Sequence, residues 1–336
     1  MNRQALSTAA AILAACSAST ASAQSVTLYG RLDVAVEAIR FSGGAAPSRT
    51  LKLLSNDGSR LGVRGSEDLG DGLRAIFNIE AALSPDTGAS GAVFWGRQAW
   101  VGLASATLGN VTLGRNYSPI DGYAWFFDAF QYGGNAATYQ AQKYSARINN
   151  SIKYVSPRLG GAELQLLVGA PERPDGVGKT YAANVSYIAD PFRATAAVQR
   201  EKIAGAAAGT SETRTDSYFG VSYNFKVVKP SLAYFHRKDS NAEAYKTLFL
   251  GVNVPVGDLG DLRANIGQIT QGGAKARSYG VGYWHSMSKR TSLYTAYARN
   301  ANDAGSNLSN FVLPSYNGIA VGQTANSLQA GIRHNF

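Results

Sequence analysis

The side chains that carry most enzyme chemistry are few and widely separated in this chain. Its three histidines, His236, His285 and His334, share no metal-binding spacing such as His-Glu-x-x-His. The sequence contains neither the Gly-x-Ser-x-Gly turn of serine hydrolases nor a glycine-rich phosphate-binding loop ending in Lys-Ser or Lys-Thr. The residues therefore predict no catalytic centre, no metal site and no cofactor.

Charge offers a different kind of chemistry. The chain has 32 Lys and Arg against 22 Asp and Glu, for a formal net charge of +10. Arginine stays charged at any physiological pH, so arginines that line a narrow passage would concentrate anions there. The basic residues are spread along the chain rather than run together, so binding to nucleic acid is not predicted.

The first 23 residues predict export. Arg3 is followed by an apolar stretch over residues 9–15 and by Ala21-Ser22-Ala23, the order of a cleaved signal peptide. Cleavage there would make Gln24 the first mature residue and would remove the only cysteine, Cys16. A lipoprotein box, Leu13-Ala14-Ala15-Cys16, is the alternative interpretation of the same segment. After residue 23 no apolar run reaches 18 residues, so a soluble fold and a closed membrane barrel remain as the two options.

Alternation with period 2 recurs along the chain and favours the barrel. Apolar positions such as Val26, Leu28 and Leu32 alternate with polar ones such as Arg31 and Asp33, and similar patterns follow Leu73 and end the chain. A half-buried strand of a soluble sandwich would show the same pattern, so the number of strands and their connections must decide. Sixteen candidate strands are centred near residues 31, 63, 78, 99, 113, 153, 166, 183, 197, 220, 233, 249, 265, 282, 295 and 330.

The connections between these strands fall into two alternating classes. Short turns such as 67–72, 108–110 and 190–191 alternate with loops over residues 40–57, 84–93, 118–146, 171–178, 201–214, 238–244, 271–276 and 301–323. Short periplasmic turns opposite longer external loops are typical of outer-membrane barrels. The fold predicted for residues 24–336 is therefore an all-β, sixteen-stranded antiparallel transmembrane barrel. The terminal aromatic, Phe336, ends an amphipathic strand and is predicted to be an assembly signal.

Specific motifs match a known family. They are SVTLYG at 25–30, SRLGVRGSEDLGDGL at 59–73, GRQAWVGL at 96–103, VTLGR at 111–115, RINNSIKY at 147–154 and GIRHNF at 331–336. The chain resembles the Gram-negative general porins, especially the trimeric porins of β-proteobacteria, and the likeness spans essentially the whole mature chain. The resemblance implies a homotrimer in the outer membrane, inserted by the barrel-assembly machinery and in contact with lipid and lipopolysaccharide.

The resemblance also implies a pore constriction. The third external loop of the family folds into the barrel, and here that loop covers residues 118–146. It contains two acids, Asp121 and Asp128, one lysine, Lys143, and many aromatic residues that could pack the loop or stack on a solute. The wall arginines that face the loop, carried over by motif, are Arg60, Arg97 and Arg147. Further arginines with a possible lumen position are Arg31, Arg64, Arg74 and Arg115.

Alternative roles remain for several of these residues. The arginines could lie at the rim or pair with lumen carboxylates such as Asp33 and Glu80. Trp95, Trp100 and Trp284 are predicted to belong to the aromatic girdles at the membrane interfaces.

The function implied is passive diffusion of small hydrophilic solutes and ions, with a preference for anions. The alternatives are a channel selective for organic or phosphate-like anions, a barrel that serves as an adhesin or anchor, and a soluble β-sandwich.

Overall fold

The computed structural model describes residues 25–43, 48–55, 58–131, 133–138, 141–308 and 319–336. The predicted signal segment and Cys16 lie outside these residues. In the part described, no helix combines the length and the apolar character needed to cross a membrane. The strands are β1 (Ser25–Ser42), β2 (Ser48–Ser55), β3 (Arg60–Gly70), β4 (Leu73–Ser84), β5 (Ala89–Ser90), β6 (Gln98–Ser105), β7 (Gly109–Tyr117), β8 (Arg147–Val155), β9 (Ala162–Gly169), β10 (Thr180–Ala189), β11 (Phe192–Ala204), β12 (Ser211–Tyr223), β13 (Lys229–Asp239), β14 (Tyr245–Val256), β15 (Gly260–Gln271), β16 (Ala274–Ser286), β17 (Thr291–Asn302) and β18 (Thr324–Asn335).

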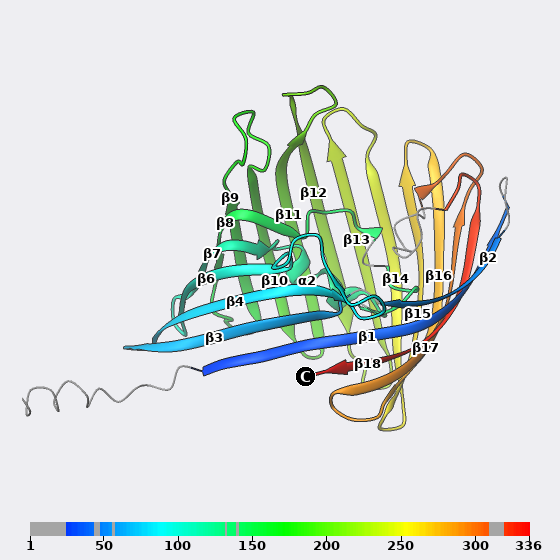
Figure 1. Cartoon of the computed structure of the whole chain (residues 1–336), viewed down its shortest axis with the longest axis horizontal. Helices are drawn as coiled ribbons and strands as arrows, with labels where there is room; N and C mark the ends of the chain where they lie inside the picture. Colours follow the sequence, from blue (N-terminus) through cyan, green and yellow to red (C-terminus); the bar gives the residue numbers. More distant parts are fainter. Residues whose placement is uncertain (1–24, 44–47, 56–57, 132, 139–140, 309–318) are drawn as a thin grey trace, which may run out of the picture.

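These strands form one closed antiparallel barrel (Figure 1). Each wall strand pairs with its neighbours in the sequence, and β18 pairs with β1 from Arg31–Asn335 to Ser42–Thr324. The strand β2 lies beside residues 34–41 of β1 and β3 beside residues 25–31, so these two share one wall position. The two-residue β5 pairs only with the end of β4. The wall therefore has sixteen strand positions, and the predicted fold class is confirmed.

The expected loop over residues 40–57 is wrong in its extent, because residues 40–42 belong to β1 and residues 48–55 form β2. The strand continues the alternation of the barrel: Leu51 and Leu53 are 72% and 59% exposed on the outer face, and Lys52 lies between them. Proline and glycine nearby, at Pro47 and Gly58, favour a loop when the sequence is considered alone. Pairing with the long β1 holds these eight residues in the wall despite their weak local signal.

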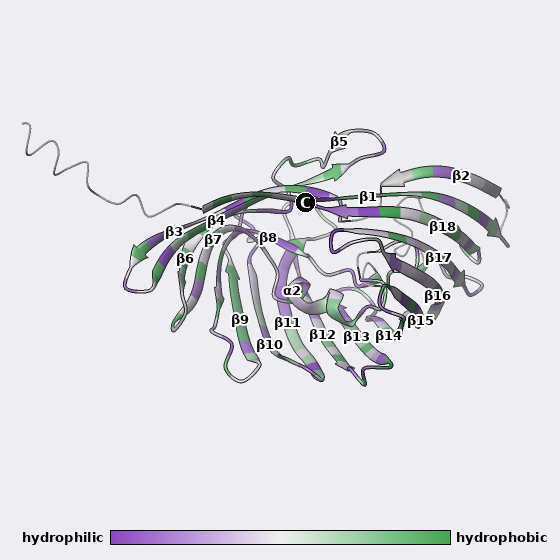
Figure 2. Cartoon of the chain, turned by 90° about the horizontal axis from the view of Figure 1, so that it is seen from below, coloured by the Kyte–Doolittle hydropathy of each residue, from purple (hydrophilic) through white to green (hydrophobic). Residues whose placement is uncertain are grey.

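The two faces of the wall differ as the alternation predicts. In β1 the side chains of Leu28, Leu32 and Val36 are exposed on the outside, while Asp33 and Glu37 are buried on the inside. Figure 2 shows hydrophilic and hydrophobic residues alternating along the strands. Apolar side chains outside and polar side chains inside suit a barrel that meets lipid on one face and water on the other.

The two ends of the described chain meet where the barrel closes. The backbone N–H of Gly30 donates to the carbonyl of Phe336 at 3.0 Å, and the N–H of Phe336 donates to the carbonyl of Gly30 at 3.1 Å. A Cβ at position 30 would lie 2.4 Å from the Phe336 ring and 2.6 Å from the carbonyl oxygen of Arg60. Glycine at position 30 therefore lets the terminal aromatic ring pack across the seam.

Candidate pore constriction

The segment between β7 and β8 leaves the wall and folds inside the ring of strands (Figure 1). Its neck is closed by a hydrogen bond from the N–H of Ser118 to the carbonyl of Ala146, at 2.9 Å. The wall is irregular just before the neck, where Gly114 has φ +131° and a Cβ would lie 2.3 Å from the carbonyl oxygen of Ala99. Within the loop are the helical turns α2 (Asp121–Ala124) and η1 (Trp125–Phe127).

Wall side chains hold the loop by hydrogen bonds to its backbone carbonyls. The hydroxyl of Tyr218 on β12 donates to Ala124 at 3.1 Å, and that of Tyr245 on β14 donates to Ala141 at 2.6 Å. These two strands lie across the barrel from β7 and β8, between which the loop leaves the wall. Irregular backbone inside a barrel needs such partners, because a buried carbonyl without one is costly.

A third hydrogen bond of the same kind lies farther along β14. The amide of Asn253 donates to the carbonyl of Ala129 at 3.0 Å. Together, the three donors fix the loop at positions 124, 129 and 141, so it is attached along most of its length.

Aromatic packing supplements these hydrogen bonds. The buried ring of Phe127 packs against Tyr218 with centroids 6.4 Å apart, and the buried ring of Phe130 meets Trp284 edge-on at 5.6 Å. Several of the loop aromatics therefore attach the loop to the wall.

The girdle position predicted for two of the tryptophans is wrong. Trp284 is 4% exposed and faces inward, because the even-numbered residues of β16 point to the interior. Trp100 is only partly exposed and is opposite Asn78 in the register, on the same face of the wall as Glu80. Trp95 lies just before β6, where its ring meets that of Phe94 edge-on at 4.6 Å, and its girdle role stays a prediction.

On the other side of the lumen, one carboxylate gathers several donors. Glu80 of β4 is 4% exposed, and its oxygens lie 2.6 Å from Nε of Arg97 and 3.7 Å from Nε of Arg60. The hydroxyls of Tyr29 and Tyr117 also donate to Glu80, at 2.8 and 2.9 Å. This set of donors satisfies a buried carboxylate and fixes the two guanidinium groups on the wall.

Arg147 extends the cluster at the base of the loop. Its guanidinium lies 5.0 Å from the centroid of the Tyr117 ring, and that of Arg97 lies 6.0 Å from the same centroid. In addition, Arg31 of β1 is directly opposite Arg60 of β3 in the strand register. The structure thus brings four of the predicted arginines to one stretch of the inner wall, together with Glu80. We call this set of five residues the arginine wall: Arg31, Arg60, Glu80, Arg97 and Arg147.

The remaining predicted arginines lie around this cluster. Arg115 donates to the carbonyl of Gly96 at 2.7 Å and to the side chain of Asn149. Arg64 lies over the ring of Tyr29, 5.0 Å from its centroid. Arg74 is opposite Asp68 near the short turn that joins β3 to β4, farther along the wall from Glu80.

The two predicted loop acids are buried within the fold of the loop. Asp121 is 2% exposed and accepts a hydrogen bond from the hydroxyl of Tyr144 at 3.0 Å. Asp128 is 5% exposed, and its two oxygens accept from the backbone N–H groups of Phe130 at 2.8 Å and Thr138 at 2.7 Å. In these positions both carboxylates stabilise turns of the loop.

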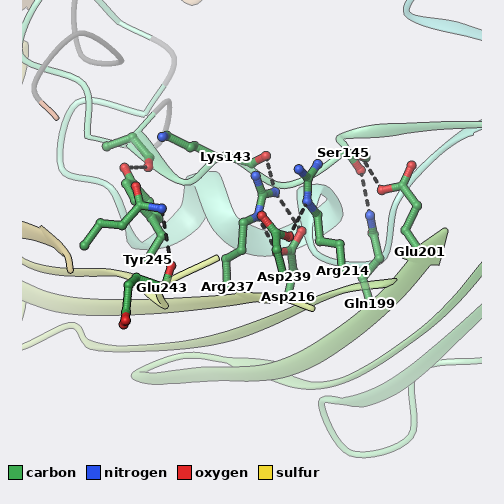
Figure 3. A network of polar contacts seen from close by, with 12 residues as sticks. Lys143, Ser145, Gln199, Glu201, Arg214, Asp216, Arg237, Asp239, Glu243 and Tyr245 are labelled. Carbon is green, nitrogen blue, oxygen red and sulfur yellow. Dashed lines mark hydrogen bonds and ion pairs between the residues drawn. The ribbon is translucent and has the colours of Figure 1, made fainter. Parts of the chain in front are cut away.

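A second set of charges lies across the lumen, where the loop meets β12 and β13 (Figure 3). Arg237 makes a two-point ion pair with Asp216 at 2.8 and 2.9 Å and also donates to the carbonyl of Lys143. Arg214 pairs with Asp239 at 2.9 Å. These pairs were not predicted from the sequence. The Arg-x-Asp spacing, repeated at 214–216 and 237–239, is the pattern that indicates them.

A third ion pair on this side lies on β15. Nε of Arg263 is 2.6 Å from a carboxylate oxygen of Asp261, and its guanidinium lies 4.3 Å from the centroid of the Trp284 ring. We call the three ion pairs the anchor wall: Arg214–Asp239, Arg237–Asp216 and Arg263–Asp261.

The ammonium of Lys143 lies beside the anchor wall, 4.3 Å from the centroid of the Tyr245 ring. Partial burial, reinforced by the positive charges of Arg237 and Arg214, lowers the pKa of Lys143 to about 8. The charge of this loop lysine therefore changes at mildly alkaline pH.

A closed sixteen-position barrel with an inward-folded loop facing a row of arginines has the architecture of a general diffusion channel. A family model described as Gram-negative porin matches residues 7–305, so the chain belongs to the Gram-negative porin family. It is 31% identical to outer membrane porin protein 32 of Delftia acidovorans, with 98% of both chains covered. It is 28% identical to an outer membrane porin protein of Bordetella pertussis, with 87% of this chain and 93% of the relative covered.

Solved structures agree with the sequence relatives. An anion-selective porin from Comamonas acidovorans superposes with a TM-score of 0.82 at 29% identity, covering 94% of this chain and all of that chain. The OmpF structure of Salmonella typhi, in complex with daunomycin, has a TM-score of 0.67 at 16% identity, covers 93% of this chain and 97% of that chain, and supports the fold alone. The protein is a porin of the outer membrane, as its resemblance implied.

Proposed function

We propose that this porin is a water-filled channel that prefers anions and that the arginine wall sets this preference. The observation that carries the proposal is the composition of that wall: Arg60 and Arg97 share the single carboxylate of Glu80, and Arg31 and Arg147 lie on the same stretch of the inner wall. In a narrow lumen with low-dielectric walls, such a surplus raises the local concentration of anions. The similarity to an anion-selective porin supports the same direction.

The loop residues have a different role in this proposal. The loop over residues 118–146 narrows the lumen, and Asp121 and Asp128 hold its shape through their hydrogen bonds to Tyr144, Phe130 and Thr138. Because both carboxylates are buried and accept hydrogen bonds within the loop, they offset the positive charge of the arginine wall less than two solvent-exposed carboxylates would. Further positive charge comes from Arg64 and Arg115 beside the arginine wall and from Arg74 nearer the short turn between β3 and β4.

Further proposals concern assembly. We propose that three copies form a homotrimer, that Phe336 is part of the signal read by the barrel-assembly machinery, and that the outer face contacts lipid and lipopolysaccharide. The position of Phe336 at the seam of the barrel, where it is 39% exposed, supports its accessibility before closure. The proposed function involves no catalytic step and no cofactor.

The experiment that tests the function is planar-bilayer recording of the refolded mature protein across a KCl gradient. We expect stable conductance steps in groups of three and a zero-current potential whose sign shows preference for chloride. A cation preference would overturn the assignment of the arginine wall while leaving the channel intact. Absence of conductance from a correctly folded barrel would favour an adhesin or anchor instead.

A further inference from the structure

A second cluster of cations lies on the outside of the barrel, away from the lumen. Lys179 precedes β10, and Arg200 and Lys202 lie near the external end of β11; all three side chains are exposed. Their neighbours along β11, Gln199 and Glu201, point inward and hydrogen-bond to the constriction loop. Because side chains alternate along a strand, Arg200 and Lys202 point outward.

The three cations line a groove of about 210 Å³. Tyr181 is paired in register with Arg200, and its ring lies 5.4 Å from the ammonium of Lys179. The backbone N–H of Lys202 donates to the carbonyl of Lys179 at 2.9 Å, which fixes the two lysines side by side. The groove is lined by Lys179, Tyr181, Arg200, Glu201, Lys202 and Thr213.

A larger groove on the outer wall has a different character. Its volume is about 380 Å³, and its lining comes from residues of β1, β2, β17 and β18. Arg40 is the one cation among the lining residues of that groove, whereas the smaller groove has three cations. The smaller groove is therefore the better candidate for an anionic ligand.

Acidic partners are missing around the smaller groove in the part of the chain that the structure describes. Among the described residues, none of the three cations lies within 4.0 Å of a carboxylate oxygen. The one acid that lines the groove, Glu201, accepts a hydrogen bond from the hydroxyl of Ser145 at 2.6 Å on the inner side. The outer surface here thus carries three positive charges close together without an ion-pair partner.

The wall between the cations and the short turns is apolar. The outward residues Val185, Val198 and Phe219 on β10–β12 are exposed, and the pair Tyr187–Phe192 closes this band at the short-turn end with ring centroids 5.9 Å apart. From β11 residue 200 to residue 192 the strand advances by roughly 26 Å. At the strand tilt of about 35–45° this length spans roughly 20 Å of membrane depth, which is most of the apolar band of about 25 Å that faces lipid in outer-membrane barrels. The cations therefore lie where the hydrocarbon of the outer leaflet gives way to headgroups.

We infer that Lys179, Arg200 and Lys202 form a binding site for the phosphorylated headgroup of an outer-leaflet lipid. The guanidinium and the two ammonium groups bind the phosphate oxygens, and the Tyr181 ring contacts the sugar or glycerol part of the headgroup. The acyl chains lie along the apolar band. Charge complementarity and this band together favour a lipid over a soluble anion.

This inference deepens the proposed contact between the outer face and lipopolysaccharide, on which it rests, by assigning that contact to three residues. It is independent of the proposed ion preference, because the side chains of the site point away from the lumen. Lipid binding and conductance can therefore be lost independently of each other. Measuring both shows whether the lipid site or the channel function is wrongly assigned.

The test compares binding of diphosphoryl lipid A and its dephosphorylated form to the full mature protein in neutral detergent micelles. The site variant is Lys179→Gln/Arg200→Gln/Lys202→Gln. The matched control, Lys226→Gln/Lys289→Gln/Arg290→Gln, removes three exposed cations from the short turns at the opposite end. Bilayer conductance of both variants verifies that each folds into an intact channel.

We expect the wild-type protein and the control variant to prefer the phosphorylated lipid by about tenfold or more, since charged hydrogen bonds are among the strong ones. The site variant should lose that preference while its conductance stays at the wild-type level. Equal preference in all three proteins, or an equal loss in the control variant, would overturn the site. Inorganic phosphate that binds as tightly as the lipid would show a soluble-anion site and overturn the lipid assignment.

Discussion

The two sides of the lumen use the same residue types for different purposes. On the arginine wall, Arg60 and Arg97 share one carboxylate, Glu80, and two further arginines, Arg31 and Arg147, lie on the same stretch of the inner wall. On the anchor wall, each arginine has its own aspartate, and Arg237 also binds the loop backbone. An arginine with its own carboxylate fixes structure, whereas two arginines that share one carboxylate, as Arg60 and Arg97 share Glu80, leave a net positive charge. The ratio of arginines to carboxylates, rather than the residue type, separates the two roles.

The largest expected effect comes from breaking the anchor wall at its most buried pair. Arg237→Leu would leave Asp216 buried without its ionic partner and would remove the donor to the Lys143 carbonyl. Loss of one partner of a buried pair costs about 3–5 kcal/mol. We expect a lower free energy of unfolding, measured in a urea titration, and a noisier single-channel current as the loop loses an attachment.

The control for this change is Arg277→Gln, which breaks the more exposed pair with Asp303. Pairs at the surface contribute about 0–1 kcal/mol, so this variant should unfold close to the wild-type protein. If Arg237→Leu behaved like the control in both stability and current noise, the anchor wall would not hold the loop.

A smaller effect concerns the loop lysine that lies beside the anchor wall. Burial and the neighbouring Arg237 and Arg214 lower the pKa of Lys143 to about 8, so its ammonium is charged below that pH and neutral above it. Raising the pH from about 7 to about 9 should therefore weaken the preference for chloride slightly in the wild-type channel. The measurement is the zero-current potential at both pH values.

Lys143→Met is the matched variant for this titration. It keeps most of the side-chain length but lacks the ionisable group, so the pH-dependent change in zero-current potential should be smaller than in the wild-type channel. A change of the same size in both channels would mean that another group titrates, and Lys143 would have no part in selectivity.

The strand rhythm is predictable from the sequence because alternation depends on local information, whereas the wall arginines follow only from the resemblance to the porin family. Alternation over residues 26–33 reports the two faces of one strand, and the motifs around Arg60, Arg97 and Arg147 lie next to recognisable strand ends. The strand β2 is not predicted from the sequence, because its pairing with β1, rather than its own residues, keeps it in the wall. The inward position of Trp284 is not predicted either, because a tryptophan near a strand end is compatible with either face of the wall until the register is known.

The anchoring contacts are not predictable for a related reason. The hydrogen bonds from Tyr245 to Ala141 and from Asn253 to Ala129 join residues more than 100 positions apart in the sequence. They depend on how far the loop extends across the lumen, and no local pattern in residues 118–146 encodes that path. The burial of Asp128 follows from the same path, since the turns of the loop enclose it.

We propose that the position of positive charge, and not its total amount, sets the preference for anions. The most direct measurement is the zero-current potential across a KCl gradient for two double variants that each remove two arginines. They are Arg31→Gln/Arg147→Gln on the arginine wall and Arg214→Gln/Arg263→Gln on the anchor wall, where both arginines lie near the ends of their strands.

We predict that the first double variant moves the potential strongly toward zero and that the second, which leaves the carboxylates of Asp239 and Asp261 without their arginines, moves it in the same direction but clearly less. Equal shifts in the two variants would show that total charge alone explains the selectivity.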